Sequence, residues 1–296
     1  MGGVAPTLDF LAVVVSAGVL IALGVFVIAP LMRRLVMREA QRVDAVAIDP
    51  RWISVLARSV PGARGLTSEE RTRLLKAARE LLTTRRWEGC GGLVLDENMK
   101  LVIAAQACLL TFAVPGGPFP GLREILVYPA GFLARRVRDR RKWVASNTNE
   151  PPTPELGEAW TNGVVVLGWE GARDGASDPQ DGQNLVLHEF AHQFANDNHL
   201  VPASISDAGL FASVSPAVRD PEKWHRVLSA SYDRLCAKGA APTVLDKYGT
   251  TDLEEFFAVA TEAFFERPAE LEIEDAELYA QLVALYRQDP TTRISR

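Results

Sequence analysis

Apolar positions along the chain form one long unbroken run near the start and shorter periodic runs after it. Residues 10–32 read FLAVVVSAGVLIALGVFVIAPLM, without a single charged side chain. A helix needs about 20 apolar residues to cross the hydrocarbon core of a bilayer. A cleaved signal peptide would place a basic residue before a shorter apolar run, and no Lys or Arg precedes Phe10. The pattern therefore predicts a transmembrane anchor over residues 8–32.

The charges that flank this run predict its orientation. One acidic residue precedes the run and several arginines follow it: Asp9, then Arg33, Arg34, Arg38 and Arg42. Basic residues beside a span favour the cytoplasmic side of the membrane. We therefore expect a single-pass protein of the inner, or cytoplasmic, membrane, with its body in the cytoplasm after a juxtamembrane segment over residues 33–66.

The rest of the chain shows both helical and strand periodicities. Helices are expected over about residues 67–82, 98–112, 221–238, 252–265 and 275–287, and strands over residues 124–129 and 163–169. Thr67 and Glu70 have the spacing of a capping box at the start of the first helix. Because helices outnumber strands, we predict an α+β fold, predominantly helical with a small sheet, in one domain over residues 67–296.

Composition excludes several classes of protein. The formal net charge of −5 provides no general attraction to nucleic acid, so direct binding of nucleic acid is not expected. Three scattered cysteines without a CxxC pair argue against a disulfide framework and against a cysteine zinc site. Residues 135–142 carry six basic side chains, which suit a solvated loop, anionic lipid or an acidic partner.

The chemistry of the chain is concentrated in residues 183–199, QNLVLHEFAHQFANDNH, which hold three of the four histidines. His188, Glu189 and His192 form an HExxH motif. On a helix, residues four apart lie on one face with their Cβ atoms about 6 Å apart. This separation suits two imidazoles that bind one zinc ion at about 2.0–2.1 Å. Glu189 would lie beside the ion, where a carboxylate can take a proton from water.

The alternative is a helix that carries two histidines by chance. This helix is largely apolar, so it would then bury two imidazoles and one carboxylate without partners. Such burial costs roughly 2–7 kcal/mol for each polar group. The sequence therefore favours one bound Zn²⁺ ion.

The third ligand is not fixed by the motif. An HExxHxxGxxH pattern needs Gly and His where this chain has Ala195 and Asn198, so the metzincin class is excluded. His199, near the end of the helix, and His225, beside a tryptophan, remain candidates that more simply fit surface or packed histidines. A carboxylate on a second helix is the other option.

The segment TTDLEEFFAVATEAFFERP, residues 250–268, offers that carboxylate. Glu255 and Glu262 are seven residues apart, so they share one face of an otherwise apolar helix. Buried glutamates need a cation or hydrogen-bonding partners. One of the two could be the ligand while the other holds a ligand histidine through its free ring N–H. Alternatively, both are solvated on the edge of the helix.

Several ordered motifs together resemble the Mlc titration factor A family of glucose-regulated zinc peptidases. They are NLVLHEFAHQ, EFFAVATEAFF and LYRQDP, with AAQACLL, ILVYP and VVVLGW in the same style, and the likeness covers about residues 50–290. The resemblance implies a zincin-like metallopeptidase core of the gluzincin type. It implies that His188, His192 and Glu255 bind zinc, that Glu189 is the catalytic base, and that Tyr248 stabilises the transition state.

The resemblance also implies a function. We expect a zinc-dependent, aminopeptidase-like hydrolase of peptide or protein substrates, acting in the cytosol from its membrane anchor. The alternative is a membrane-tethered protein that sequesters a transcriptional repressor with little or no peptidase activity. A structural zinc site, or a hydrolase of another class, remains a further possibility.

Overall fold

The computed structural model describes residues 48–129, 163–175, 181–201, 218, 220–239 and 241–294. The predicted anchor over residues 8–32 and the basic run over residues 135–142 lie outside these residues. Within the described chain, no helix has both the length and the apolar character that crossing a bilayer requires. The anchor and its orientation therefore stay predictions from the sequence.

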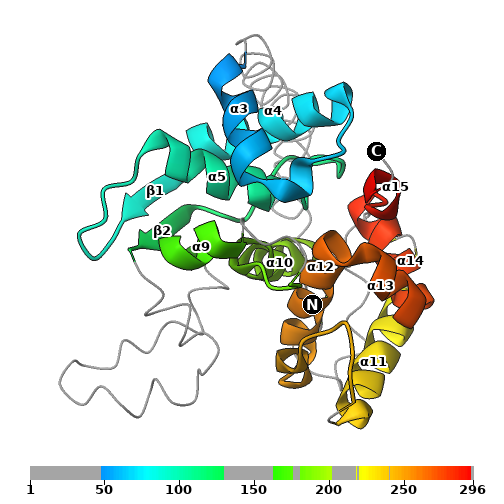
Figure 1. The fold of residues 1–296 in the computed structure, drawn as a ribbon. Coiled ribbons are helices and arrows are strands. Elements are labelled where there is room, and N and C mark those ends of the chain that lie inside the picture. Colours follow the sequence, from blue (N-terminus) through cyan, green and yellow to red (C-terminus); the bar gives the residue numbers. More distant parts are fainter. Residues whose placement is uncertain are drawn as a thin grey trace, which may run out of the picture. The chain divides into compact units, whose positions relative to one another are not determined.

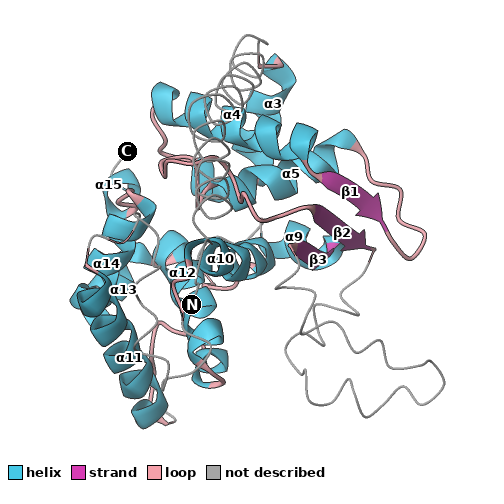
Figure 2. Cartoon of the chain, turned by 180° about the vertical axis from the view of Figure 1, so that it is seen from behind, coloured by secondary structure: helices cyan, strands magenta, loops and turns pink. Residues whose placement is uncertain are grey.

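The strands form one parallel sheet in the order β1-β2-β3 (Figure 1 labels β1 and β2, and Figure 2 labels all three). The strands are β1 (Arg86–Gly89), β2 (Glu124–Tyr128) and β3 (Val164–Gly168). Ile125 of the central strand pairs with Trp87 on one side and with Val165 on the other. The two predicted strands are thus confirmed. β1 was not predicted, because its sequence RWEG has no apolar alternation and its residues are mostly exposed.

The first three helices pack together: α3 (Pro50–Ser59) and α4 (Ser68–Thr84), which precede β1, and α5 (Glu97–Cys108), which lies between β1 and β2 in the sequence. α5 lies against both α3 and α4. The capping box of α4 is confirmed, since Thr67 N–H donates to Glu70 at 2.8 Å and Glu70 N–H donates to Thr67 Oγ1 at 3.2 Å. α3 lies in the segment predicted as juxtamembrane, and a short 3₁₀ turn (η2, Pro61–Ala63) follows it.

α5 ends earlier than predicted, at Cys108 instead of residue 112. From there the backbone tightens into bonds between residues three apart, such as Leu109 N–H to Gln106 O at 3.1 Å and Leu110 N–H to Ala107 O at 3.1 Å. The carbonyl of Leu109 accepts a hydrogen bond from the Gln288 side chain at 2.7 Å. A contact from the far end of the chain therefore fixes this helix end, and local periodicity does not contain that information.

The remaining elements follow the sheet: α9 (Trp169–Gly175), α10 (Leu185–Asn198), α11 (Pro221–Lys238), η5 (Lys247–Thr250), α12 (Leu253–Glu266), α13 (Pro268–Glu274), α14 (Ala276–Tyr286) and α15 (Thr291–Ile294). α10 packs against α12, β3, α5 and α9. Figure 2 shows that helices make up most of the described chain. The prediction of a mostly helical fold with a small sheet is confirmed, while its zincin-like character stays a prediction.

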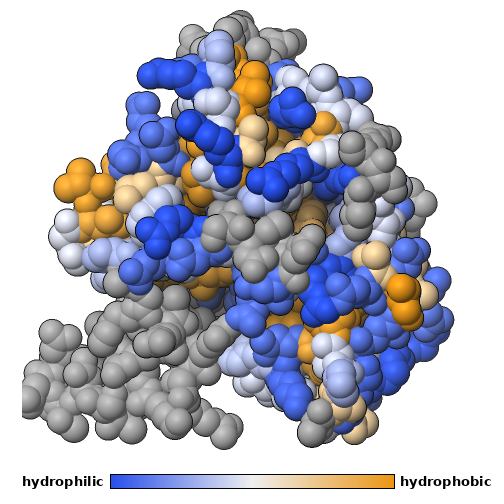
Figure 3. Space-filling model, in the orientation of Figure 1, coloured by the Kyte–Doolittle hydropathy of each residue, from blue (hydrophilic) through white to orange (hydrophobic). Residues whose placement is uncertain are grey.

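α10 and α12 carry several fully buried aromatic side chains of one extended hydrophobic core: Phe190, Phe256, Phe257 and Phe264. Phe190 packs against Phe119, and the other three pack against aromatic side chains of α11 and α14. Burying each such side chain contributes about 1.5–3 kcal/mol. The described surface on the face seen in Figure 3 is mainly hydrophilic. The large exposed apolar side chains of the described residues are far apart in the sequence, on α3, on the loop before α5 and on α13: Ile53, Val94 and Ile273. The two central helices are therefore held rigidly, which matters for the side chains they carry.

The start of β3 depends on a glycine, and this dependence is testable. Gly163 has φ +71°, and a Cβ there would lie 2.1 Å from the carbonyl oxygen of Gly121. We expect Gly163→Ala to lower the free energy of unfolding by about 2–4 kcal/mol, from backbone strain plus the forced shift of the neighbouring loop. Thermal or urea unfolding of the purified protein measures this loss.

The matched control is Gly92→Ala. Gly92 also has a positive φ, +82°, but a Cβ there would meet nothing within 4 Å. We expect a loss of only about 1 kcal/mol, from backbone strain alone. Equal losses for the two variants would contradict the close approach of Gly163 to Gly121.

Candidate metal centre

α10 is built to present its histidines from a buried helix. Asn184 caps its start, accepting the Leu187 N–H at 3.0 Å with its side-chain oxygen. The helix ends at Asn198, and the next residue, His199, caps it in the left-handed conformation with φ 51°. Because apolar side chains surround the helix, His188 and His192 are only 7% and 6% exposed. Both imidazoles are thus held by packing on a fixed backbone.

α12 supplies the carboxylates. Asp252 caps this helix by accepting the Glu255 N–H at 2.9 Å. Because α10 and α12 pack against each other (Figures 1 and 2), Glu255 and Glu262 both reach the His188 side chain. The prediction that the two glutamates share a buried face of one helix is confirmed, and the reading of two solvated glutamates is wrong.

Three ligand atoms converge at one point. His188 Nε2 lies 3.0 Å from Glu255 Oε2 and 3.3 Å from His192 Nε2, and His192 Nε2 lies 3.3 Å from Glu255 Oε2. Ligands on a tetrahedral ion with bonds of about 2.0–2.1 Å are separated by about 3.3 Å. His188, His192 and Glu255 therefore have the spacing that could hold one metal ion.

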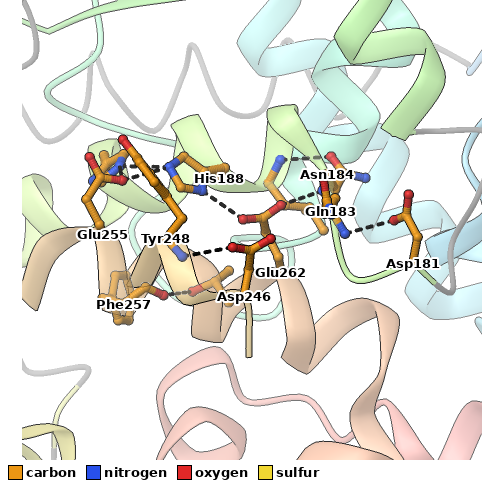
Figure 4. Close-up of polar contacts among 12 residues, drawn as sticks. Asp181, Gln183, Asn184, His188, Asp246, Tyr248, Glu255, Phe257 and Glu262 are labelled. Atoms are coloured by element: carbon orange, nitrogen blue, oxygen red, sulfur yellow. Dashed lines mark hydrogen bonds and ion pairs between the residues drawn. The ribbon is translucent and has the colours of Figure 1, made fainter. Parts of the chain in front are cut away.

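The protonation pattern strengthens this fit. The other ring nitrogen of His188, Nδ1, lies 2.7 Å from Glu262 Oε1, where Nδ1–H donates to the carboxylate (Figure 4). In the neutral ring this leaves Nε2 with a lone pair that faces two further acceptor atoms. Three electron-pair donors that point at one another need either a metal ion or a proton between them. Glu262 thus has the supporting contact that sequence spacing had suggested for one of the two glutamates.

Negative charge accumulates around this point. Glu189 is 0% exposed, Glu255 is 1% exposed and Glu262 is 7% exposed. Buried charge is costly unless it is compensated, and Coulomb attraction is strong in the protein interior. A divalent cation between α10 and α12 would offset most of this charge, so the donor set fits a metal ion in charge as well as in geometry.

The same contacts shift the pKa values of the site. Burial raises the pKa of Glu255, but hydrogen bonds with His188 and His192 outweigh it and hold this pKa well below its usual range. Burial lowers the pKa of His188, but the charge of Glu262 and the hydrogen bond with Glu255 raise it well above its usual value. A proton and a metal ion therefore compete for the same nitrogen lone pair.

Tyr248 lies at the edge of this centre. Its ring centroid is 5.9 Å from that of His188, and Figure 4 shows it on the side of Glu255. Asp246 fixes the local turn by accepting the Tyr248 N–H at 2.8 Å. Gly249 allows the turn to lie close to α11, because a Cβ there would come within 3.2 Å of the Leu235 Cδ2 atom. The structure thus brings the tyrosine beside the cluster.

The other candidate ligands lie elsewhere. His199 terminates α10, and His225 on α11 pairs its Nδ1 with Ser229 Oγ at 3.1 Å. Neither belongs to the cluster of possible ligands found among the described residues.

Two polar residues near the site were not singled out from the sequence. Asn184 donates its backbone N–H to Glu262 at 2.5 Å, and its side chain contacts Gln106 of α5 at 3.1 Å. An Asn directly before an apolar run signals a helix cap. That signal identifies the capping role of Asn184 but not its contact with a residue 78 positions away.

A helix with an HExxH motif, joined by a glutamate from a second helix around a possible metal position, defines a metallopeptidase-like protein. The chain belongs to the family described as glucose-regulated metallo-peptidase M90, whose model matches residues 34–287. The resemblance noted from the sequence motifs is confirmed.

Individual relatives agree with this assignment. The protein slr2042 of Synechocystis sp. is 32% identical over 247 residues, which cover 82% of this chain and 86% of the relative. A Mlc titration factor A of Yersinia enterocolitica is 30% identical over 245 residues, 81% of this chain and 86% of the relative. The Mlc titration factor A of Yersinia pestis (strain Pestoides F) is 29% identical over 246 residues, again 81% and 86%.

Metal binding is tested by Glu255→Gln, which removes the charge of one ligand while keeping its shape. We expect this variant to bind a divalent metal ion more weakly than the parent protein. The affinity loss should exceed the roughly 10–100-fold loss that is typical when a residue that only orients a ligand is changed. Elemental analysis after dialysis, with titration against a chromophoric chelator, measures this loss. Glu254→Gln is the matched control, because Glu254 is adjacent but exposed. Equal metal affinity in both variants would exclude Glu255 as a ligand.

Proposed function

We propose that this protein is a zinc-dependent peptidase of the gluzincin type. The observation that carries the proposal is the convergence of His188 Nε2, His192 Nε2 and Glu255 Oε2 within 3.3 Å of one another. The metallopeptidase family to which the chain belongs supports it. Three protein ligands suit catalysis better than structure, because structural zinc sites almost always have four.

Zinc bound at this point would polarise a peptide carbonyl and lower the pKa of water toward about 7. Glu189 follows His188 on α10 and is fully buried beside it. Its carboxylate would accept a proton from the attacking water and return that proton to the leaving amine nitrogen. His188 is held for this task by its Nδ1–H bond to Glu262 at 2.7 Å.

Tyr248 would stabilise negative charge on the carbonyl oxygen of the substrate. Its ring lies 5.9 Å from the His188 ring, so its hydroxyl can approach a substrate held at the cluster. A hydrogen bond donated to a developing oxyanion strengthens in the transition state and typically contributes about 2.7–4 kcal/mol.

The peptide would lie along β3. β3 is the last strand of the described sheet, and α10 packs against it. An extended peptide beside such a strand gains main-chain hydrogen bonds, while pockets select its side chains. We propose aminopeptidase-like cleavage on the basis of the family resemblance.

A second candidate function rests on the relatives. Those from Yersinia are named Mlc titration factor A. On this alternative, the chain sequesters a transcriptional repressor through its surface, and hydrolysis is secondary or absent. The two candidates differ in whether Glu189 is required.

Glu189→Gln separates them. We expect hydrolysis of a peptide library to fall about 10²–10⁴-fold, because Gln cannot accept the proton from water. Zinc content is the internal control and should not change, since Glu189 is not one of the three clustered ligands. Cleavage that persists undiminished in the variant would contradict the peptidase mechanism. Absence of cleavage by the zinc-loaded parent protein would favour sequestration.

Tyr248→Phe tests the proposed oxyanion contact. We expect kcat to fall about 10²–10³-fold, with little change in KM or zinc content. Tyr232→Phe is the control, because Tyr232 contacts the same turn by donating its hydroxyl hydrogen to Thr250 O at 3.3 Å. A fall in kcat that is equal in both variants would mean that only the packing of η5 matters.

A further inference from the structure

A chain of buried hydrogen bonds leads from α5 and α9 to the metal centre. Gln106 of α5 donates from Nε2 to the carbonyl of Ala172 in α9 at 3.1 Å. Its Oε1 accepts from Asn184 Nδ2 at 3.1 Å. Asn184 then donates its backbone N–H to Glu262 Oε2 at 2.5 Å, and Glu262 Oε1 holds His188 Nδ1 at 2.7 Å (Figure 4). Each link joins two different elements of the fold.

The orientation of both amides is fixed by their partners. Asn184 Oδ1 must accept because it faces the Leu187 N–H, and Asn184 Nδ2 must donate because it faces the Gly175 carbonyl at 3.1 Å. Gln106 Nε2 likewise faces the carbonyls of Val102 and Ala172. A carbonyl can only accept, so neither amide can be flipped without losing bonds. The direction of each of these bonds is therefore fixed: Asn184 donates both to Gln106 and to Glu262, and Glu262 accepts from Asn184 and from His188.

Asn184 is the point where these contacts meet. Its side chain caps α10, and its Nδ2 also lies 3.0 Å from Glu266 Oε1, one helical turn beyond Glu262 on α12. Its backbone carbonyl accepts the His188 N–H at 2.9 Å. One residue thus sets the start of α10 against α12 and places the backbone donor that holds the Glu262 carboxylate.

We propose that Asn184 is a positioning residue that fixes the His188 imidazole through Glu262, with Gln106 tying this arrangement to α5 and α9. This inference rests on the proposed metal site. The backbone N–H of residue 184 sets the rotation of the Glu262 carboxylate, and this carboxylate sets the orientation of the His188 ring. Partners that orient a ligand histidine commonly change metal affinity by about 10–100-fold.

The principal test is Asn184→Ser. Serine keeps a good helix cap but removes the two Nδ2–H donors. A cavity of about 20 Å³ lined by Gln106, Asn184 and Glu266 adjoins the position, so it leaves room for water beside the shortened side chain. We expect zinc affinity, measured by competition with a chromophoric chelator, to fall about 10-fold. In a Glu262→Gln background, Asn184→Ser should cause no further loss, because it acts through Glu262.

Thr261→Val is the matched control for destabilisation. Thr261 lies on α12 and is fully buried, and its hydroxyl hydrogen-bonds to the Tyr286 hydroxyl at 2.7 Å. The substitution removes this bond and leaves the hydrogen bonds of Gln106, Asn184 and Glu262 in place. We expect a comparable drop in Tm with unchanged zinc affinity. Equal affinity losses in the two variants would reduce Asn184 to a structural role. The proposal would also be overturned if Asn184→Ser lowered zinc affinity by the same factor in the Glu262→Gln background as in the parent protein.

A second readout does not depend on metal or activity. The chain has only four histidines, so the His188 Nδ1–H signal can be assigned in the nitrogen-proton NMR spectrum of metal-free protein by its loss in Glu262→Gln. We expect the chemical shift of this signal to change in Asn184→Ser and to remain unchanged in Thr261→Val. If Asn184→Ser does not fold, Gln106→Met should shift the same signal to a smaller extent. An unmoved signal contradicts the proposal even if the protein proves to bind no zinc, so the two failures are distinguishable.

Discussion

The arrangement of α10 and α12 depends on one electrostatic constraint, the burial of two imidazoles and three carboxylates between two apolar helices. Neither helix could bury its own polar groups alone. His188 and His192 need a positive partner or a proton, and Glu255 needs a positive charge in a place that water hardly reaches. The packing of phenylalanines on both helices supplies the rigidity, and the polar cluster makes only one relative placement acceptable.

Much of the fold could be read from the sequence, because its signals are local. The capping box of α4, the apolar body of α12 and the β-branched residues of β3 each predict one element, and each was found. α3 was missed although Asp49 and Pro50 form a good start signal, because the segment was interpreted by its nearness to the apolar run. The end of α5 could not be predicted, since Gln288 acts on it from a distance of 179 residues in sequence.

Part of the site could also be predicted, because the spacing of its residues along each helix is local information. The HExxH spacing alone places His188 and His192 on one face of α10. Seven-residue spacing places Glu255 and Glu262 on one face of α12, but spacing cannot tell which carboxylate meets Nε2 and which meets Nδ1. That distinction depends on the offset between the helices, which is a tertiary property. Tyr248 was found only through family resemblance, and the contacts of Asn184 with α5 depend wholly on the folded chain.

The two glutamates of α12 also limit how the length of this chain can change. A helix turns by about 100° per residue, so one inserted or deleted residue between positions 255 and 262 would rotate one carboxylate by about 100°, away from the face that the two glutamates share. The interval between Glu255 and Glu262 therefore does not tolerate an insertion or a deletion. The connections outside α10 and α12 can lengthen without moving either glutamate relative to the other. Among descendants of this sequence, gaps should therefore accumulate in the loops and leave this interval untouched.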